Sequence, residues 1–159
     1  MKTIREKKLK KIYEVAKMHG SIIDEPFPKD LVGMSLILPN GECLIFVGDE
    51  IEEPYTVLEV LAHELGHYMT NGFYDIYTPY YGRKNVERLA DLWAYYFVMN
   101  PFEVEKAYKE GIKDIDDLAY YFGVSQEFVE EALEAYDTSE GADFLESYCE
   151  FRFGNKENE

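Results

Sequence analysis

Two of the three histidines in this 159-residue chain lie four residues apart, in the pentapeptide His63-Glu64-Leu65-Gly66-His67. Apolar residues recur around the pentapeptide at spacings of three and four, which predicts a helix over about residues 54–70. Residues four apart lie one above the other on a helix, so the two imidazoles can converge on one metal ion with Glu64 beside them. The opposite face is apolar and must pack on a core. The chain therefore needs a helix with one buried face and one face open to a site.

The two histidines do not complete a catalytic metal site, because zinc at such a site takes three protein ligands and keeps one position for water. The next helical pattern, residues 85–99, offers Glu87 and Asp91 on one face. Glu87 would be the third ligand, and Asp91 would accept the free N–H of a ligating histidine and fix its orientation. Without the histidines, a solvated acidic helix edge would be the favoured interpretation of this pair. The alternative for His63 and His67 is that they are ordinary helix residues without a metal.

The segment before the predicted histidine helix combines one helix with two short strands. Residues 4–18 carry apolar side chains at helical spacing with Lys and Glu between them, and Glu25-Pro26-Phe27-Pro28 favours an extended linker. Two β-rich segments, Met34–Pro39 and Glu42–Val47, flank Asn40-Gly41, the dipeptide that best fits a two-residue turn. These segments predict an antiparallel hairpin.

The segment after the histidine helix begins with a predicted loop. Residues 72–83 contain glycine, proline and four tyrosines without a clean period. After Asn100-Pro101, further helical patterns follow at residues 102–111, 114–122, 125–136 and 141–151. The pair around Gly123-Val124-Ser125 resembles a helix-turn-helix. Residues 126–134 hold four glutamates and no Lys or Arg, so we expect this pair to dock on the core or capture a protein rather than contact DNA.

These elements predict a mostly helical α+β fold. We expect one domain with a small antiparallel β-sheet or hairpin packed on the histidine helix, and a C-terminal helical hairpin. Residues 1–101 would form the core, with the N-terminal helix, the hairpin, the histidine helix and the third-ligand helix. Residues 102–159 would form a helical extension packed on that core.

Composition limits the classes of function. With 16 Lys and Arg against 32 Asp and Glu, the net charge of −16 opposes binding to nucleic acid or anionic lipid. Apolar stretches end well short of the roughly 18 residues of a membrane span, and the N-terminal segment lacks the apolar region of a secretory signal. Cys43 and Cys149 form no metal-clamp pattern and are expected to be ordinary thiols. We expect a cytoplasmic protein with no membrane association and no direct nucleic-acid binding.

The order of the motifs resembles a known family. The pentapeptide His63–His67 is followed by Glu87-Arg88-Leu89-Ala90-Asp91-Leu92-Trp93-Ala94 and then by Val98-Met99-Asn100-Pro101. This series resembles the ImmA/IrrE family of zinc metallopeptidases, within the wider Glu-zincin group. The likeness continues through residues 115–119 and 122–125. The chain departs from the family where Leu89 replaces a frequent second acidic residue and where Asn100 separates Met99 from Pro101.

The resemblance implies one zinc ion per chain, ligated by His63, His67 and Glu87, with Glu64 as general base. It implies hydrolysis of peptide bonds in a protein substrate by water, without a covalent enzyme intermediate. Such proteins often come from phages or mobile elements and cleave a partner transcriptional repressor of the helix-turn-helix type, acting as anti-repressors. An acidic enzyme suits a basic DNA-binding substrate, because complementary fields speed encounter. The alternative is a metal-stabilised regulatory protein that acts on such a partner by sequestration without proteolysis.

Two parts of the expected site stay open at the level of sequence. An oxyanion or substrate contact would come from the loop after the histidine helix, with Tyr74, Tyr77, Tyr80, Tyr81 and Arg83 as candidates by proximity in sequence alone. The strand at Glu42–Val47 would have either a free edge that receives an extended peptide, as in Glu-zincins, or an edge covered by another strand.

Overall fold

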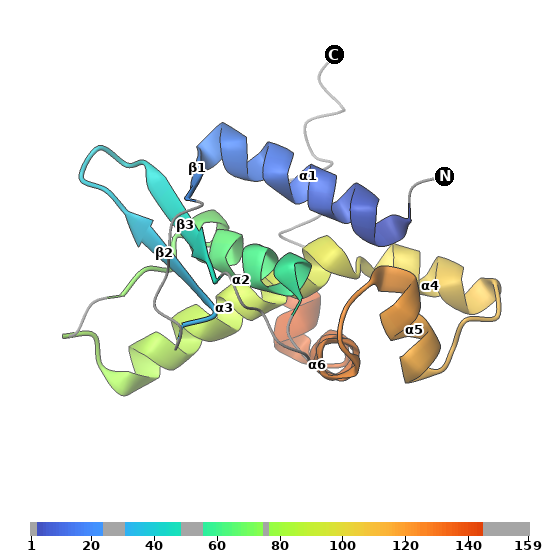
Figure 1. The fold of residues 1–159 in the computed structure, drawn as a ribbon. Coiled ribbons are helices and arrows are strands. Elements are labelled where there is room, and N and C mark those ends of the chain that lie inside the picture. Colours follow the sequence, from blue (N-terminus) through green and yellow to red (C-terminus); the bar gives the residue numbers. More distant parts are fainter. Residues whose placement is uncertain (1–2, 24–30, 49–55, 75–76, 145–159) are drawn as a thin grey trace, which may run out of the picture.

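The histidine pentapeptide lies on a helix, as its spacing predicts. In the computed structural model, which describes residues 3–23, 31–48, 56–74 and 77–144, this helix is α2, Val57–Met69 (Figure 1). Thr56 caps its start by accepting the backbone N–H of Glu59 at 3.3 Å. The predicted start at Pro54 lies outside the described residues. The helix ends before Asn71, which adopts a positive φ of 52°.

The buried face of α2 packs closely against α3, Tyr80–Val98. Leu58, Leu61 and Leu65 are at most 1% exposed. Gly66 lies at the closest approach of the two helices, since a Cβ there would come within 2.6 Å of the Ala90 carbonyl oxygen. A glycine is therefore needed at this position for α3 to lie close beside the histidines.

The first turn of α3 corrects the predicted loop. Residues 80–83 are helical rather than part of a loop over 72–83. Tyr80 and Tyr81 are 70% and 83% exposed, so this turn projects into solvent and has no buried stripe. Without a buried stripe the sequence has no apolar period from which a helix could be predicted.

The predicted antiparallel hairpin is confirmed. Strands β2, Gly33–Ile37, and β3, Cys43–Val47, pair antiparallel with Met34 opposite Phe46. Gly41 in the turn has a φ of 84°, but Asn40 does not have a positive φ. Leu38 accepts the N–H of Gly41 at 2.8 Å and donates to the carbonyl of Glu42 at 2.8 Å, so three residues make the turn and the predicted two-residue turn is wrong. The sheet lies against α2, and a Cβ on Gly33 would come within 3.0 Å of the Glu64 carboxylate.

A third strand makes the sheet mixed rather than purely antiparallel. Helix α1, Ile4–His19, leads directly into β1, Gly20–Ile23, which pairs parallel with β3. A strand of four residues is too short to show an alternating pattern, so β1 could not be predicted from the sequence. Strand β3 is thus central, and the idea of a free edge at Glu42–Val47 is wrong. In the described part of the sheet, β1 and β2 are the two edge strands, and each has one side without a strand partner.

The C-terminal helices follow the predicted boundaries closely. They are α4, Pro101–Lys109, α5, Ile115–Phe122, and α6, Gln126–Tyr136. Gly123, with a φ of 72°, ends α5, and Ser125 caps α6, so the predicted helical hairpin is present. Of the predicted helix at 141–151, only residues 141–144 are described, and they are helical.

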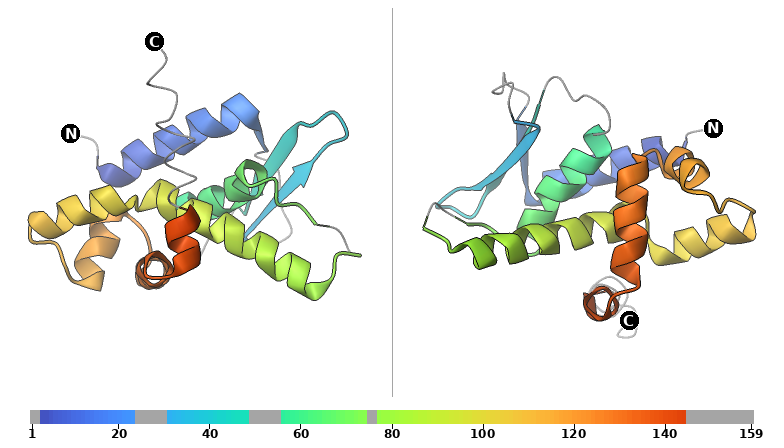
Figure 2. Two further views of the ribbon diagram at one scale, coloured as in Figure 1. Left: turned by 180° about the vertical axis from the view of Figure 1, so that it is seen from behind. Right: turned by 90° about the horizontal axis from the view of Figure 1, so that it is seen from below.

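Helices α1 to α6 and the sheet all contribute side chains to one apolar core. Helix α1 lies along α2 and reaches α5, while α6 crosses α3, as the view from below shows (Figure 2). The core includes Ile12, Tyr96 and Phe122, each at most 1% exposed, and the buried thiol Cys43. Cys149 lies outside the described residues. No described helix is long and apolar enough to cross a membrane. The division of the chain at residue 101 stays a prediction.

One buried carboxylate joins the histidine helix to the C-terminal hairpin. The Glu59 carboxylate accepts the backbone N–H of Ser125 at 2.5 Å and its hydroxyl at 3.2 Å. The Ser125 hydroxyl in turn accepts the N–H of Phe128 at 3.1 Å. Burial raises the pKa of Glu59, and the bonds from Ser125 oppose that shift. Glu59 thus fixes the start of α6 to α2.

Replacing Glu59 by alanine is expected to lower the free energy of unfolding by about 1.5–3 kcal/mol, because the buried N–H of Ser125 loses a charged acceptor. Glu59→Gln keeps an acceptor oxygen and should lose about 1 kcal/mol or less. Urea unfolding measures both, with the exposed Glu130→Ala on α6 as control. An unfolding free energy for Glu59→Ala equal to that of wild type would show that this contact does not stabilise the fold.

Candidate metal centre

Three possible ligand atoms converge between α2 and α3. His63 and His67 lie one turn apart on α2, and Glu87 lies on α3 opposite them. The Nε2 atoms of the two histidines are 3.2 Å apart. Glu87 places Oε2 3.1 Å from Nε2 of His63 and Oε1 3.5 Å from Nε2 of His67. Among the residues that the structure describes, these three form the one group suited to hold a metal ion.

The other ring nitrogen of each histidine is engaged elsewhere, which directs both Nε2 atoms to the centre. Nδ1 of His63 lies 2.7 Å from Oδ1 of Asp91. Nδ1 of His67 lies 2.8 Å from the carbonyl oxygen of Gly72. A carbonyl oxygen only accepts hydrogen bonds, so Nδ1 of His67 carries the proton, and an ionised Asp91 sets the same tautomer in His63. In the neutral form of each ring, the Nε2 lone pair therefore points to the centre and can bind a cation.

The spacing of these atoms fits a metal ion. Tetrahedral bonds of roughly 2.0–2.1 Å to each ligand separate the ligand atoms by about 3.3–3.4 Å. The observed separations of 3.1, 3.2 and 3.5 Å bracket that value. Two imidazoles and one carboxylate are also a usual donor set for a catalytic zinc site that leaves a fourth position open. The residues present thus fit a divalent metal ion.

The electrostatics of the centre favour positive charge. Burial alone lowers the pKa of His63, but hydrogen bonds with Asp91 and Glu87 and the nearby carboxylates raise it to about 10. The same histidines lower the pKa of Glu87. Without a metal ion, the surrounding carboxylates keep a proton on His63. A divalent cation bound at the same place would replace this proton and balance the negative charge of the carboxylates.

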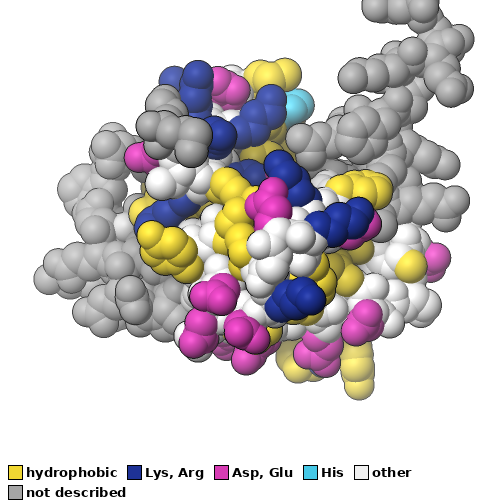
Figure 3. All heavy atoms as spheres, turned by 90° about the vertical axis from the view of Figure 1, so that its right-hand side faces the viewer, with side chains coloured by type: hydrophobic (Ala, Val, Ile, Leu, Met, Phe, Trp, Pro, Cys, Tyr) yellow, Lys and Arg dark blue, Asp and Glu magenta, His cyan; other side chains and the backbone are white. Residues whose placement is uncertain are grey.

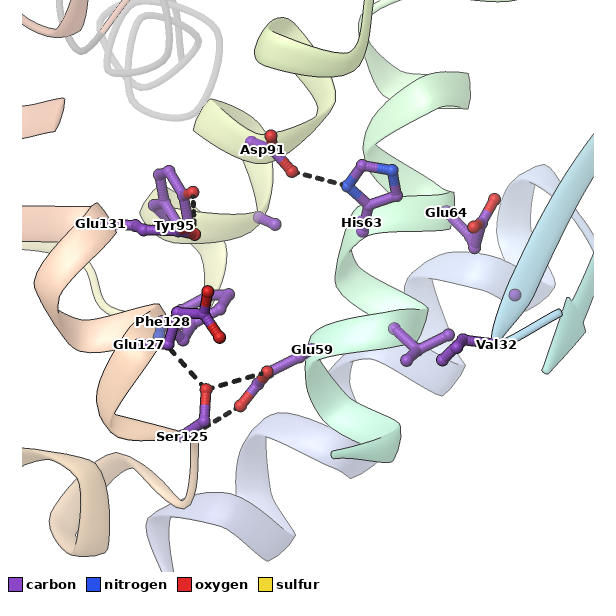
Figure 4. Close-up of a pocket in the computed structure, with 13 residues that line it drawn as sticks. Val32, Glu59, His63, Glu64, Asp91, Tyr95, Ser125, Glu127, Phe128 and Glu131 are labelled. Carbon is purple, nitrogen blue, oxygen red and sulfur yellow. Dashed lines mark hydrogen bonds and ion pairs between the residues drawn. The ribbon is translucent and has the colours of Figure 1, made fainter. Parts of the chain in front are cut away.

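Glu64 lies beside the metal ligands and is turned toward the sheet. Its side chain points to β2 from the side of α2 (Figure 4) and the residue is 8% exposed. Burial raises the pKa of Glu64, while the histidines and a hydrogen bond with Ser35 oppose this shift. The carboxylate lines two cavities of about 400 Å³ each, which also share His63 and Gly33. Glu64 therefore lies at the junction of two spaces that open on the metal centre.

The structure separates the five candidates in the loop after α2. Tyr74 lines the cavity along β2, its hydrogen bond with Glu87 raises its pKa, and its ring lies 6.5 Å from that of His67. Tyr77, Tyr80 and Tyr81 are strongly exposed and line neither cavity, and Arg83 donates to the carbonyl oxygen of Thr78 at 2.8 Å. The structure brings only Tyr74 to the centre.

Sequence reasoning missed three contributions to the site. The Gly72 carbonyl that orients His67 is a backbone atom, so no residue type identifies it. Ser35 and Gly33 lie close to Glu64 because α2 packs against β2. The spacing of residues along the sequence does not reveal such packing between elements. The one signal in the sequence for this contact is Gly33 itself, because a glycine in a strand often marks a close approach of the backbone to a neighbouring group.

Asp91→Ala is expected to lower the affinity for Zn²⁺ by about 10- to 100-fold, because His63 loses the carboxylate that fixes its ring and tautomer. Competition with a chelating dye measures this affinity. Asp91→Asn keeps an oxygen acceptor and should lose less. The exposed Asp117→Ala on α5 serves as control, and an unchanged affinity in Asp91→Ala would contradict the role given to this contact.

Comparisons with known proteins agree with this geometry. The profile of the peptidase family Peptidase_M78, described as an IrrE N-terminal-like domain, matches residues 33–134. The matched stretch begins at β2 and contains α2 and α3 with all three candidate ligands. Searches of curated proteins and of solved structures found no match.

Proposed function

Because the chain belongs to the IrrE N-terminal-like peptidase family, we propose that it is a zinc-dependent endopeptidase that cuts peptide bonds of a protein substrate. The observation that carries this proposal is the convergence of two Nε2 atoms and one carboxylate beside a buried glutamate. His63, His67 and Glu87 would hold the ion. Zinc in such a site would act as a Lewis acid toward a carbonyl oxygen and lower the pKa of a bound water molecule to about 7.

Glu64 is the proposed general base. Its carboxylate lies next to the histidines, and its raised pKa makes the ionised form a stronger proton acceptor. In this role it takes a proton from the attacking water and passes it to the nitrogen of the leaving amine. The carboxylate is enclosed by β2 and α2, which keeps it close to where both transfers occur.

Strand β2 is the proposed support for the substrate backbone. Its outer edge has no strand partner among the described strands and borders the cavity that contains His63, Glu64 and His67. An extended peptide could add to this edge and lie across the metal centre. Tyr74 lines the same cavity, so it is the proposed hydrogen-bond donor to the developing oxyanion.

A helix-turn-helix repressor is the proposed protein substrate, by resemblance to anti-repressor members of the family carried by phages or mobile elements. The net charge of −16 supports this choice, since DNA-binding proteins are basic and opposite charges accelerate encounter.

Glu64→Gln is expected to bind zinc as wild type does and to lose about 10²- to 10⁴-fold in turnover, because the amide cannot accept the proton. The assay follows cleavage of a pool of proteome-derived peptides, and of helix-turn-helix repressors from the same genome, by mass spectrometry.

Glu130→Gln, an exposed change of the same kind on α6, should keep full turnover. Cleavage by Glu64→Gln at the wild-type rate would refute the role of Glu64. If neither wild type nor variant cuts but both bind the repressor equally, sequestration replaces proteolysis as the function.

A further inference from the structure

One of the two cavities at the metal centre is walled by the C-terminal hairpin. This space, the acidic cavity, holds about 400 Å³ between α2, α3 and α6 and opens beside Val32 and Gly33 at the start of β2 (Figure 4). It shares His63 and Glu64 with the metal centre. A substrate that crosses the metal centre can therefore place one side chain in it.

The acidic cavity carries strong negative charge. Its lining includes five carboxylates and, among the described residues, no Lys or Arg. They are Glu59, Glu64, Asp91, Glu127 and Glu131. No ion pair joins any of them to a lysine or arginine in the described parts of the chain. Apart from the pair of His63 with Asp91, these carboxylates repel one another, and a cationic side chain among them would relieve that repulsion.

The carboxylates influence one another across the cavity. Glu127 on α6 raises the pKa of Glu59 on α2, in addition to the larger effect of burial. Burial, with Asp91, Glu131 and Glu127 nearby, also raises the pKa of Tyr95, whose hydroxyl donates to Glu131 at 2.9 Å. Charges on three different helices thus act on the same space.

The walls also suit a long aliphatic stem. Val60 and Phe128 are 7% exposed and line the cavity from α2 and α6, and Val32 lines its opening. Lysine and arginine place their methylene groups on apolar surface and their charge among polar atoms. The exposed Glu127 and Glu131 would meet the cationic end, while the buried Glu59 already binds Ser125.

One end of the molecule separates its charges by face. In the view onto the end at which α4 and α5 lie, Asp and Glu side chains gather along the lower edge and most Lys and Arg side chains lie above them (Figure 3). The acidic lower edge would attract a basic polypeptide.

We propose that the acidic cavity binds a lysine or arginine side chain of the substrate next to the bond that is cut, with Glu127 and Glu131 determining this specificity. The cutting of that bond rests on the proposed function, whereas binding of the side chain does not. The substrate class is accordingly a polypeptide with a basic residue near the scissile bond.

Binding to zinc-loaded Glu64→Gln tests the proposal without cleavage. The probes are two peptide pools that are identical except for one central residue, arginine in one and citrulline, its neutral isostere, in the other. The arginine pool is expected to bind about five- to tenfold more tightly, since each of these two exposed carboxylates contributes about a two- to fivefold effect. Adding Glu127→Gln and Glu131→Gln should remove most of this preference.

The matched control adds Glu130→Gln and Glu134→Gln, which remove the same charge from the same helix outside the cavity lining and should leave the preference intact. Circular dichroism verifies that each variant folds. The proposal is overturned if the arginine pool fails to bind, if both pools bind equally, or if the preference survives loss of Glu127 and Glu131.

Cleavage of proteome-derived peptides by the wild-type zinc enzyme separates this inference from the proposed function. Sites should be enriched in Lys or Arg at one position near the cut. Cutting without this enrichment contradicts the acidic cavity but not the peptidase. Absence of cutting, with the arginine preference in binding intact, contradicts the peptidase but not the cavity.

Discussion

The close packing of α2 on α3 is the constraint on which the rest of the site depends. Gly66 allows the two helices to approach at Ala90, and this approach brings Glu87 to the Nε2 atoms of both histidines. The same contact brings Asp91 to Nδ1 of His63. A larger side chain at position 66 would push α3 away and separate the ligands by more than a metal ion can span. One residue without a side chain thus determines whether three distant donors form a single centre.

The charges around this centre are arranged in two zones. At the metal ligands, carboxylates face histidines at hydrogen-bond distance, so each negative charge has a specific partner that a cation can replace. Toward α6, the donors that the described residues offer to these carboxylates, Ser125 and Tyr95, are neutral, so the negative charge remains available to a ligand. Both zones border the same buried Glu64, so the proposed metal binding, proton transfer and substrate choice would meet at this residue.

Much of this could be predicted from the sequence because it depends on spacing within one element. Three local patterns are present in the structure: the i, i+4 histidines, the helix face with Glu87 and Asp91, and the hairpin at Asn40-Gly41.

The remaining features could not be predicted, because they depend on contacts between elements that are distant in the sequence. Strand β1 is too short to show a pattern, the Gly72 carbonyl has no side chain, and the acidic cavity joins residues about 70 positions apart that only the docking of α6 brings together. The same docking places Glu127 and Glu131 in a cavity that borders the candidate metal centre.

The measurement that tests the central claim most directly is the metal content of the purified chain by mass spectrometry, beside Glu87→Ala and the His63→Ala/His67→Ala double variant. The account predicts about one zinc ion per wild-type chain, as expected for a three-ligand site, and its loss in both variants after dialysis against a weak chelator. A wild-type chain that neither contains zinc nor takes it up, or variants that retain it in full, would contradict a metal centre at these three residues.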